Sequence, residues 1–220
     1  MSPNSREWDE RGAALLLAIV LVTILGVLAS VIALTALTET LVSGRVEQVQ
    51  ALRYAADGAL TLALADLSVA DWTAALGGAP STFTDGNPAT VRQIPGLDPL
   101  QLCCGANTLS AAVLQAANAG RGWGLDTPQW RLYVWGPVSA WLDAGVIQAP
   151  FYVAVWIADD PADGDGDPVT DANGTIALYA AAIGPRGGRR AARALIARPT
   201  AAGIPPLRGV RIVAWHETQW

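Results

Sequence analysis

Lysine is absent from this 220-residue chain, histidine occurs once, at His216, and the two cysteines are neighbours, Cys103 and Cys104. Without lysine there is no P-loop lysine, Schiff-base lysine or Ser/Lys nucleophile site. One histidine and two cysteines are too few for a multi-ligand zinc site, and a His-based triad would depend on a residue near the C-terminus. The composition therefore predicts that the protein is not an enzyme.

Charge is also scarce. Charged residues make up 15% of the chain and hydrophobic residues 52%, whereas soluble domains carry about 25% charged residues. The formal net charge is −5 and the isoelectric point about 4.7, so the chain lacks the basic surface that nucleic acid requires. We therefore expect part of the chain to lie in lipid and no nucleic-acid partner.

A segment without charged residues runs from Gly12 to Thr38, between Arg11 and Glu39. As a helix it would span roughly 40 Å, more than the ~30 Å hydrocarbon core of a bilayer. It is also longer than the apolar region of an ordinary secretory signal. We expect residues 13–38 to form a single membrane-spanning segment.

The helix is predicted to continue beyond the membrane. No proline occurs between Pro3 and Pro80, so nothing in this interval must break a helix. Residues 39–67 follow a heptad pattern that only Arg53 interrupts; its apolar positions are Val42, Val46, Val49, Ala56, Leu60, Ala63 and Leu67. The pattern predicts an amphipathic second half that packs partly on the protein's own sheet and partly on neighbouring subunits.

Residues 68–220 are predicted to form an α+β globular domain. The stretch 77–105 is rich in Gly, Pro, Thr and Asp and is typical of irregular structure. A short helix is expected at Ser110–Ala119, with Ser110 as its cap. Strands are expected at Trp130–Trp135, Phe151–Ile157, Thr175–Ile183, Ala192–Ala197 and Val210–Trp215.

The adjacent cysteines leave three states open. Cys103 and Cys104 could form a vicinal disulfide, pair with another chain or stay reduced. Side chains of neighbouring residues in an extended segment point apart, which disfavours a shared metal ion. The sequence assigns no redox function to the pair.

An acidic loop is predicted at residues 159–174, between two of the expected strands. Asp163, Asp165 and Asp167 alternate, and Asp171 follows at the ninth position counted from Asp163. Oxygen ligands at this spacing can wrap Ca²⁺, although the loop is not an EF-hand because Pro168 and Gly174 replace its glycine and glutamate. The alternative is a solvated acidic turn, since Asp, Gly, Pro and Asn are ordinary turn residues.

The N-terminal region resembles the class III signal of type IV pilins and pseudopilins. The residues that carry the likeness are Glu10-Arg11-Gly12 followed by Ala13-Ala14-Leu15-Leu16-Leu17, and later Tyr54-Ala55-Ala56-Asp57-Gly58. They are most similar to the start of PilX-type minor pilins. Residues 150–217 resemble that group more loosely. Pilins commonly place a glutamate at the fifth mature position, which here is Leu17.

The resemblance implies a pilin-like fold, with a long helix packed on a small antiparallel sheet. It also implies that residues 1–12 are a leader, which a prepilin peptidase removes between Gly12 and Ala13. The protein would then be a structural minor pilin in the assembly or priming of a type IV pilus, with other pilin subunits as partners. It would cross the bacterial inner membrane once, with its domain in the periplasm, and later lie in the pilus or at the cell surface.

Two alternatives remain open. One is a tip-type pseudopilin of a type II secretion system. The other is a membrane-anchored adhesin or receptor that depends on calcium and does not polymerise.

Overall fold

The computed structural model describes residues 5–94, 96–119, 127–141, 150–162, 164–199 and 209–218, with the side chains of the first helix described from Gly12 onward. The chain divides into two compact units, Met1–Gln48 and Val49–Trp220.

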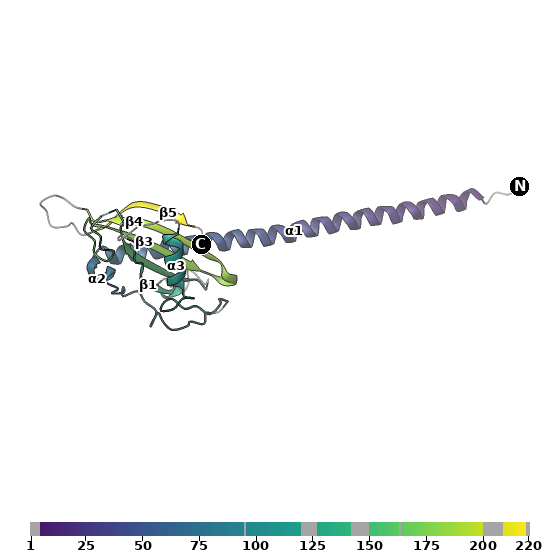
Figure 1. The fold of residues 1–220 in the computed structure, drawn as a ribbon. Coiled ribbons are helices and arrows are strands. Elements are labelled where there is room, and N and C mark those ends of the chain that lie inside the picture. The colour runs from purple at the N-terminus through teal and green to yellow at the C-terminus, as the bar shows by residue number, and fades with distance from the viewer. Residues whose placement is uncertain are drawn as a thin grey trace. The chain divides into compact units, whose positions relative to one another are not determined.

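The first element, α1, is a single helix that spans Ser5–Leu67 (Figure 1). The predicted continuous helix is therefore confirmed through Leu67, although it begins at Ser5 rather than at Ala13. The glycines at positions 12, 26, 44 and 58 do not interrupt it. Tertiary or lipid surroundings can offset the low helix propensity of glycine, and the absence of proline leaves every helical hydrogen bond available.

Two shorter helices follow, α2 at Trp72–Leu76 and α3 at Leu109–Asn118. Asp71 caps α2, because its carboxylate accepts a hydrogen bond from the Thr73 amide at 3.0 Å. Helix α3 confirms the predicted helix near residue 110, but its cap is Thr108 rather than Ser110. The Ser110 hydroxyl instead accepts a hydrogen bond from the indole of Trp156 at 2.9 Å.

Five antiparallel strands form one sheet in the order β1-β2-β3-β4-β5. Each strand pairs with the next along the chain, and all five lie where the sequence predicts a strand. Their bounds are β1 Arg131–Pro137, β2 Tyr152–Asp159, β3 Thr175–Ile183, β4 Arg189–Ala197 and β5 Arg211–Thr218.

The central strands are buried on both faces. One face of the sheet packs against the 52–67 part of α1 and includes Val153, Val155 and Leu178. The opposite face packs against α3 and includes Trp156 and Tyr179. The uninterrupted apolar sequences of β2 and β3 suit this double burial, because a strand with one wet face would alternate apolar and polar residues.

One glycine is required by close packing between α1 and the sheet. A Cβ atom on Gly184, which follows β3, would lie 2.9 Å from Leu52 and 3.0 Å from the ring of Phe151. Both neighbours are buried, so neither can move aside without disturbing the core. The chain after β3 can therefore pass α1 closely only because residue 184 has no side chain.

The chain thus has an α+β fold in which a long N-terminal helix with an apolar first half packs, through its second half, on a five-stranded antiparallel sheet. This is a pilin-like architecture.

Candidate assembly surface, acidic loop and cysteine pair

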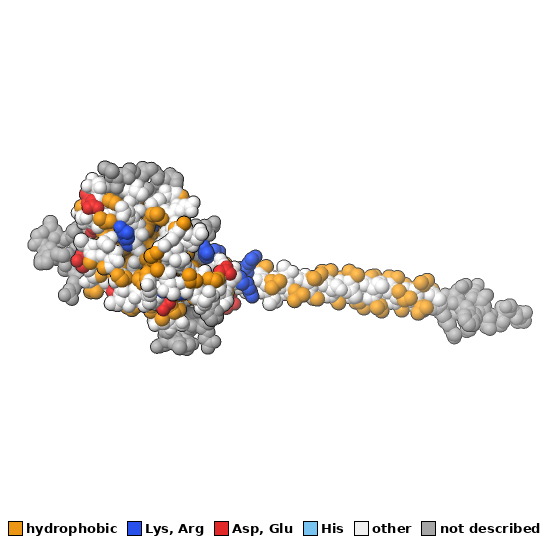
Figure 2. Space-filling model, turned by 60° about the horizontal axis from the view of Figure 1, so that its bottom comes forward, with side chains coloured by type: hydrophobic (Ala, Val, Ile, Leu, Met, Phe, Trp, Pro, Cys, Tyr) orange, Lys and Arg blue, Asp and Glu red, His pale blue; other side chains and the backbone are white. Residues whose placement is uncertain are grey.

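The apolar half of α1 is exposed along its whole described length. Every residue from Gly12 to Glu47 is exposed, and apolar side chains line the visible face of this segment (Figure 2). By length and composition, the helix can cross a membrane. An exposed apolar surface of this extent is unfavourable in water, which is consistent with a single membrane anchor or a signal sequence.

Five hydroxyl groups within this segment have partners inside the helix. Each donates a hydrogen bond of 2.8–2.9 Å to the backbone carbonyl three or four residues earlier; the donors are Thr23, Ser30, Thr35, Thr38 and Thr40. These bonds satisfy polar groups that would otherwise be costly in a hydrocarbon environment. The segment is therefore suited to lipid despite its serines and threonines.

The predicted processing site lies within α1. Gly12 and Ala13 are both helical and exposed. A Cβ atom on Gly12 would meet no atom within 4 Å. Packing within the chain therefore does not require a glycine at position 12. A need for glycine there would have to come from another protein, such as a peptidase.

The apolar residues of the heptad pattern in α1, called the seam from here on, divide into exposed and buried groups. Val42 and Val46 are 56% and 50% exposed, and Val49 is half-buried. Leu60 is only 3% exposed and packs in the protein's own core. The seam thus packs on the sheet from Ala56 onward, whereas its first positions are available to a partner.

An apolar groove of about 340 Å³ lies between α1 and the sheet, within the second unit. Its helical wall consists largely of small residues, and three aromatic side chains line it. The wall residues on α1 are Ala51, Tyr54, Ala55, Gly58, Ala59 and Leu62, and those opposite are Val138, Trp141, Phe151 and Val153. Trp141 thus faces the groove, whereas Trp130 and Trp135 are buried in the core.

Two acidic residues on α1 face the sheet. The hydroxyl of Tyr133 donates a 2.5 Å hydrogen bond to Asp66; burial, reinforced by this carboxylate, raises the pKa of Tyr133. Asp57 lies near the ion pair between Arg53 and Glu217. Burial is the main cause that raises the pKa of Asp57, and the negative charge of Glu217 raises it further. The positive charge of Arg53 lowers it.

Three aspartates of the acidic loop accept hydrogen bonds from the loop's own backbone. Asp165 accepts the Asp167 amide at 2.8 Å, Asp167 accepts the Val169 amide at 3.2 Å, and Asp171 accepts the amides of Gly174 and Thr175. Positive φ angles at Gly164, Gly166 and Gly174 allow the turns between them. The carboxylates therefore act as turn-forming acceptors, a role open to both the calcium-binding and the solvated-turn hypotheses.

Among the described residues, no group of three or more His, Cys, Asp or Glu side chains is placed to hold a metal ion. Asp163, the first ligand that the spacing predicts, lies outside those residues. The calcium hypothesis therefore still depends on the sequence spacing alone.

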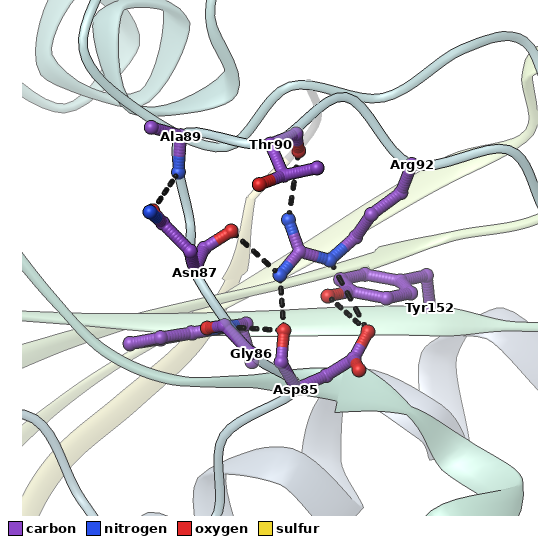
Figure 3. A network of polar contacts seen from close by, with 8 residues as sticks. Asp85, Gly86, Asn87, Ala89, Thr90, Arg92 and Tyr152 are labelled. Atoms are coloured by element: carbon purple, nitrogen blue, oxygen red, sulfur yellow. Dashed lines mark hydrogen bonds and ion pairs between the residues drawn. The ribbon is translucent and has the colours of Figure 1, made fainter.

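A polar network around Arg92 was not predicted from the sequence (Figure 3). The Arg92 guanidinium contacts the Asp85 carboxylate at 3.2 Å and donates to the carbonyls of Asp85, Asn87 and Thr90. The hydroxyl of Tyr152 donates to the same Asp85 carboxylate at 3.2 Å. The Arg92 side chain is 11% exposed, and its donors hold the irregular segment 85–92 in place beside the sheet.

Cys103 and Cys104 are joined by a disulfide in the structure. They lie in the loop that leads into α3, where Cys103 is half-buried and Cys104 is exposed.

Comparison with protein-family models, with curated proteins and with solved structures found no match for this chain. Its relation to pilins is thus one of architecture: a pilin-like fold with a hydrophobic N-terminal helix.

Proposed function

We propose that this protein is a structural minor pilin of the PilX type that takes part in assembly or priming of a type IV pilus. The observation that carries the proposal is the division of α1. Residues 12–47 are all exposed and carry no charge before Glu39, whereas one face of residues 52–67 is buried against the sheet. A plain membrane anchor needs no such continuous helix, but a subunit that packs among similar helices does.

The processing site and location follow from the same proposal. A prepilin peptidase at the inner membrane would cleave after Gly12 and leave Ala13 as the mature N-terminus. Before assembly the protein would cross the inner membrane once, with its globular domain in the periplasm. After assembly it would lie in the pilus, beside other pilin subunits.

Leu17 supports a place at the end of a filament. It stands at the fifth mature position and is 71% exposed. A carboxylate at this depth of the bilayer is costly and needs a partner, such as the N-terminal amine of a neighbouring subunit. A chain with leucine at this position needs no such partner. The same property also suits a tip-type pseudopilin of a type II secretion system.

Photo-crosslinking in a pilus-forming host tests the proposal. A photoreactive residue at Val46, an exposed position of the seam, should give adducts with other pilin subunits in membranes and in sheared pili. The same residue at Glu47, an exposed neighbour that points away from the seam, is the matched control and should give fewer. Adducts with secretion pseudopilins would favour the alternative subunit. Equal labelling at both positions, or no adduct with any pilin-like protein, would contradict an assembly role.

A further inference from the structure

The Cys103–Cys104 disulfide lies at the boundary between core and solvent. Leu102, immediately before it, is completely buried, whereas Cys104 is exposed. Reduction of a disulfide requires a thiolate to reach one sulfur atom, so exposed disulfides are the more easily reduced. This bond is therefore open to chemistry from solvent while its loop stays anchored in the core.

Cys104 has a backbone conformation that a non-glycine residue rarely adopts. Its φ angle is +75°, in the left-handed region that side chains disfavour. A bond between the side chains of adjacent residues restricts the backbone of both. We infer that the disulfide holds Cys104 in this conformation, and that without it the residue would relax toward negative φ.

The same loop caps helix α3. The amides of Leu109 and Ser110 donate to the carbonyls of Gln101 and Leu102 at 3.0 and 2.9 Å, which closes the loop around the cysteines. The Thr108 hydroxyl donates to the Gly105 carbonyl at 2.8 Å and accepts the Ala111 amide at 3.4 Å. Gly105, whose carbonyl accepts the hydrogen bond from Thr108, directly follows Cys104. A change in the backbone conformation of Cys104 therefore acts next to the cap of α3.

Helix α3 links the loop to the second face of the sheet. Leu109 and Val113 are buried there, and Ser110 receives the hydrogen bond from the Trp156 indole. Loosening the cap would release the first turn of α3 from this face, because a helix N-terminus loses stability when its amides lose their acceptors.

We propose that Cys103–Cys104 is a redox-sensitive switch in which a dithiol reductant opens the disulfide and thereby loosens the loop 101–108 and the first turn of α3. One thiolate of the dithiol attacks a cysteine sulfur to give a mixed disulfide, and its second thiol then displaces that cysteine. The dithiol becomes a disulfide, and Cys103 and Cys104 become two thiols. The proposal is independent of whether the protein assembles into a pilus.

Hydrogen exchange of the full chain in detergent, with and without dithiothreitol, tests the switch. Reduction should release two titratable thiols per chain. The amides of Leu109, Ser110 and Ala111 should then exchange about tenfold faster or more, whereas amides in β2 and β3 should not change. If no thiols are released, or if two are released and exchange at 109–111 stays the same, the proposal is wrong.

Two double variants test the role of the backbone. Cys103→Ser with Cys104→Ser should exchange at residues 109–111 as the reduced protein does and should not respond to dithiothreitol. Cys103→Ser with Cys104→Gly should recover part of the protection, because glycine accepts a positive φ without a side-chain penalty. Full protection in the double-serine variant would contradict the switch, and no recovery with glycine would contradict the conformational explanation.

Discussion

At the scale of single residues, Leu60 shows how the two halves of α1 differ. It is buried against the sheet, whereas apolar residues only a few turns earlier, such as Val46, are half-exposed. Burial of a leucine in a close-packed core contributes about 1.5–3 kcal/mol relative to exposure. Single substitutions can therefore separate the role of α1 in folding from its role in assembly.

Leu60→Asp should strongly destabilise the domain. The variant loses buried apolar area and places an unpaired carboxylate in the core, at a cost of about 3–5 kcal/mol. Thermal unfolding should shift down by roughly 10 °C for a domain of this size. Gln50→Asp, at an exposed position of the same helix, is the control and should unfold close to the wild type. Equal unfolding temperatures for the two variants would refute the packing of the seam.

Asp57 should make stability depend on pH. The pKa of the Asp57 carboxyl is raised in the folded state above its ordinary value of 3.8. The folded protein therefore binds a proton at Asp57 more tightly than the unfolded chain does. As a result, the free energy of unfolding increases as the pH falls from the raised pKa toward 3.8. Above that window the charged carboxylate opposes folding. The effect should be small, because the side chain is partly screened by solvent.

Asp57→Asn removes this charge and should unfold at a slightly higher temperature than the wild type near pH 7. The difference should shrink as the pH is lowered toward 4, where protonation removes the charge from the wild type as well. Thermal melts across this range provide the measurement. A variant that is less stable at pH 7, or a difference that grows toward low pH, would show that Asp57 contributes a favourable interaction instead.

At the scale of elements, the acidic loop between β2 and β3 carries the calcium hypothesis. Calcium that binds only the folded protein would stabilise it by about 2.7 kcal/mol at a hundredfold excess over Kd. The hypothesis therefore predicts that calcium raises the melting temperature by a few degrees. Magnesium should do so poorly, because its rigid octahedral geometry suits a flexible loop of protein ligands badly.

Asparagine variants separate the calcium effect from the turn itself. Asp165→Asn and Asp167→Asn keep a side-chain oxygen that can accept the amides of Asp167 and Val169 but lose the charge that attracts calcium. They should fold as the wild type does without calcium and lose the calcium-dependent rise. Superimposable wild-type melts with calcium, magnesium and chelator would show that the loop is a solvated acidic turn.

The helices and strands were largely predictable because their signals are local. The uncharged run, the heptad pattern and the absence of proline predict α1 through Leu67, and five β-rich runs predict the five strands. The cap of α3 was placed wrongly at Ser110. That serine receives a hydrogen bond from Trp156, a partner far away in the sequence, so its role follows from tertiary packing rather than from its position near a helix start.

The Arg92 network could not be predicted for a similar reason. Its donors reach carbonyl groups of an irregular segment and a carboxylate shared with Tyr152, and no periodic pattern marks such contacts. The second covered face of the sheet did have a signal, because β2 and β3 are apolar at consecutive positions rather than at alternate ones. The state of the cysteine pair depends on geometry that sequence spacing does not contain.

At the scale of the whole molecule, processing should depend on Gly12. Gly12→Leu should block removal of the leader, because a branched side chain would clash in the peptidase site. The chain itself tolerates the change, since a Cβ atom there meets nothing within 4 Å. Gly26→Leu, equally unhindered in the same helix, is the matched control and should be processed normally. Immunoblots that resolve the precursor from the mature form provide the measurement, and normal cleavage of the Gly12 variant would contradict the assignment of the site.

The pilin-like account is tested most directly by the N-terminus of the mature protein. The full chain would be produced in a bacterium with an active prepilin peptidase, purified from membranes and examined by intact mass and N-terminal sequencing. The account predicts a chain that begins at Ala13, whose amine is open to methylation. A chain that still begins at Met1, or one cut near Thr38, would contradict it.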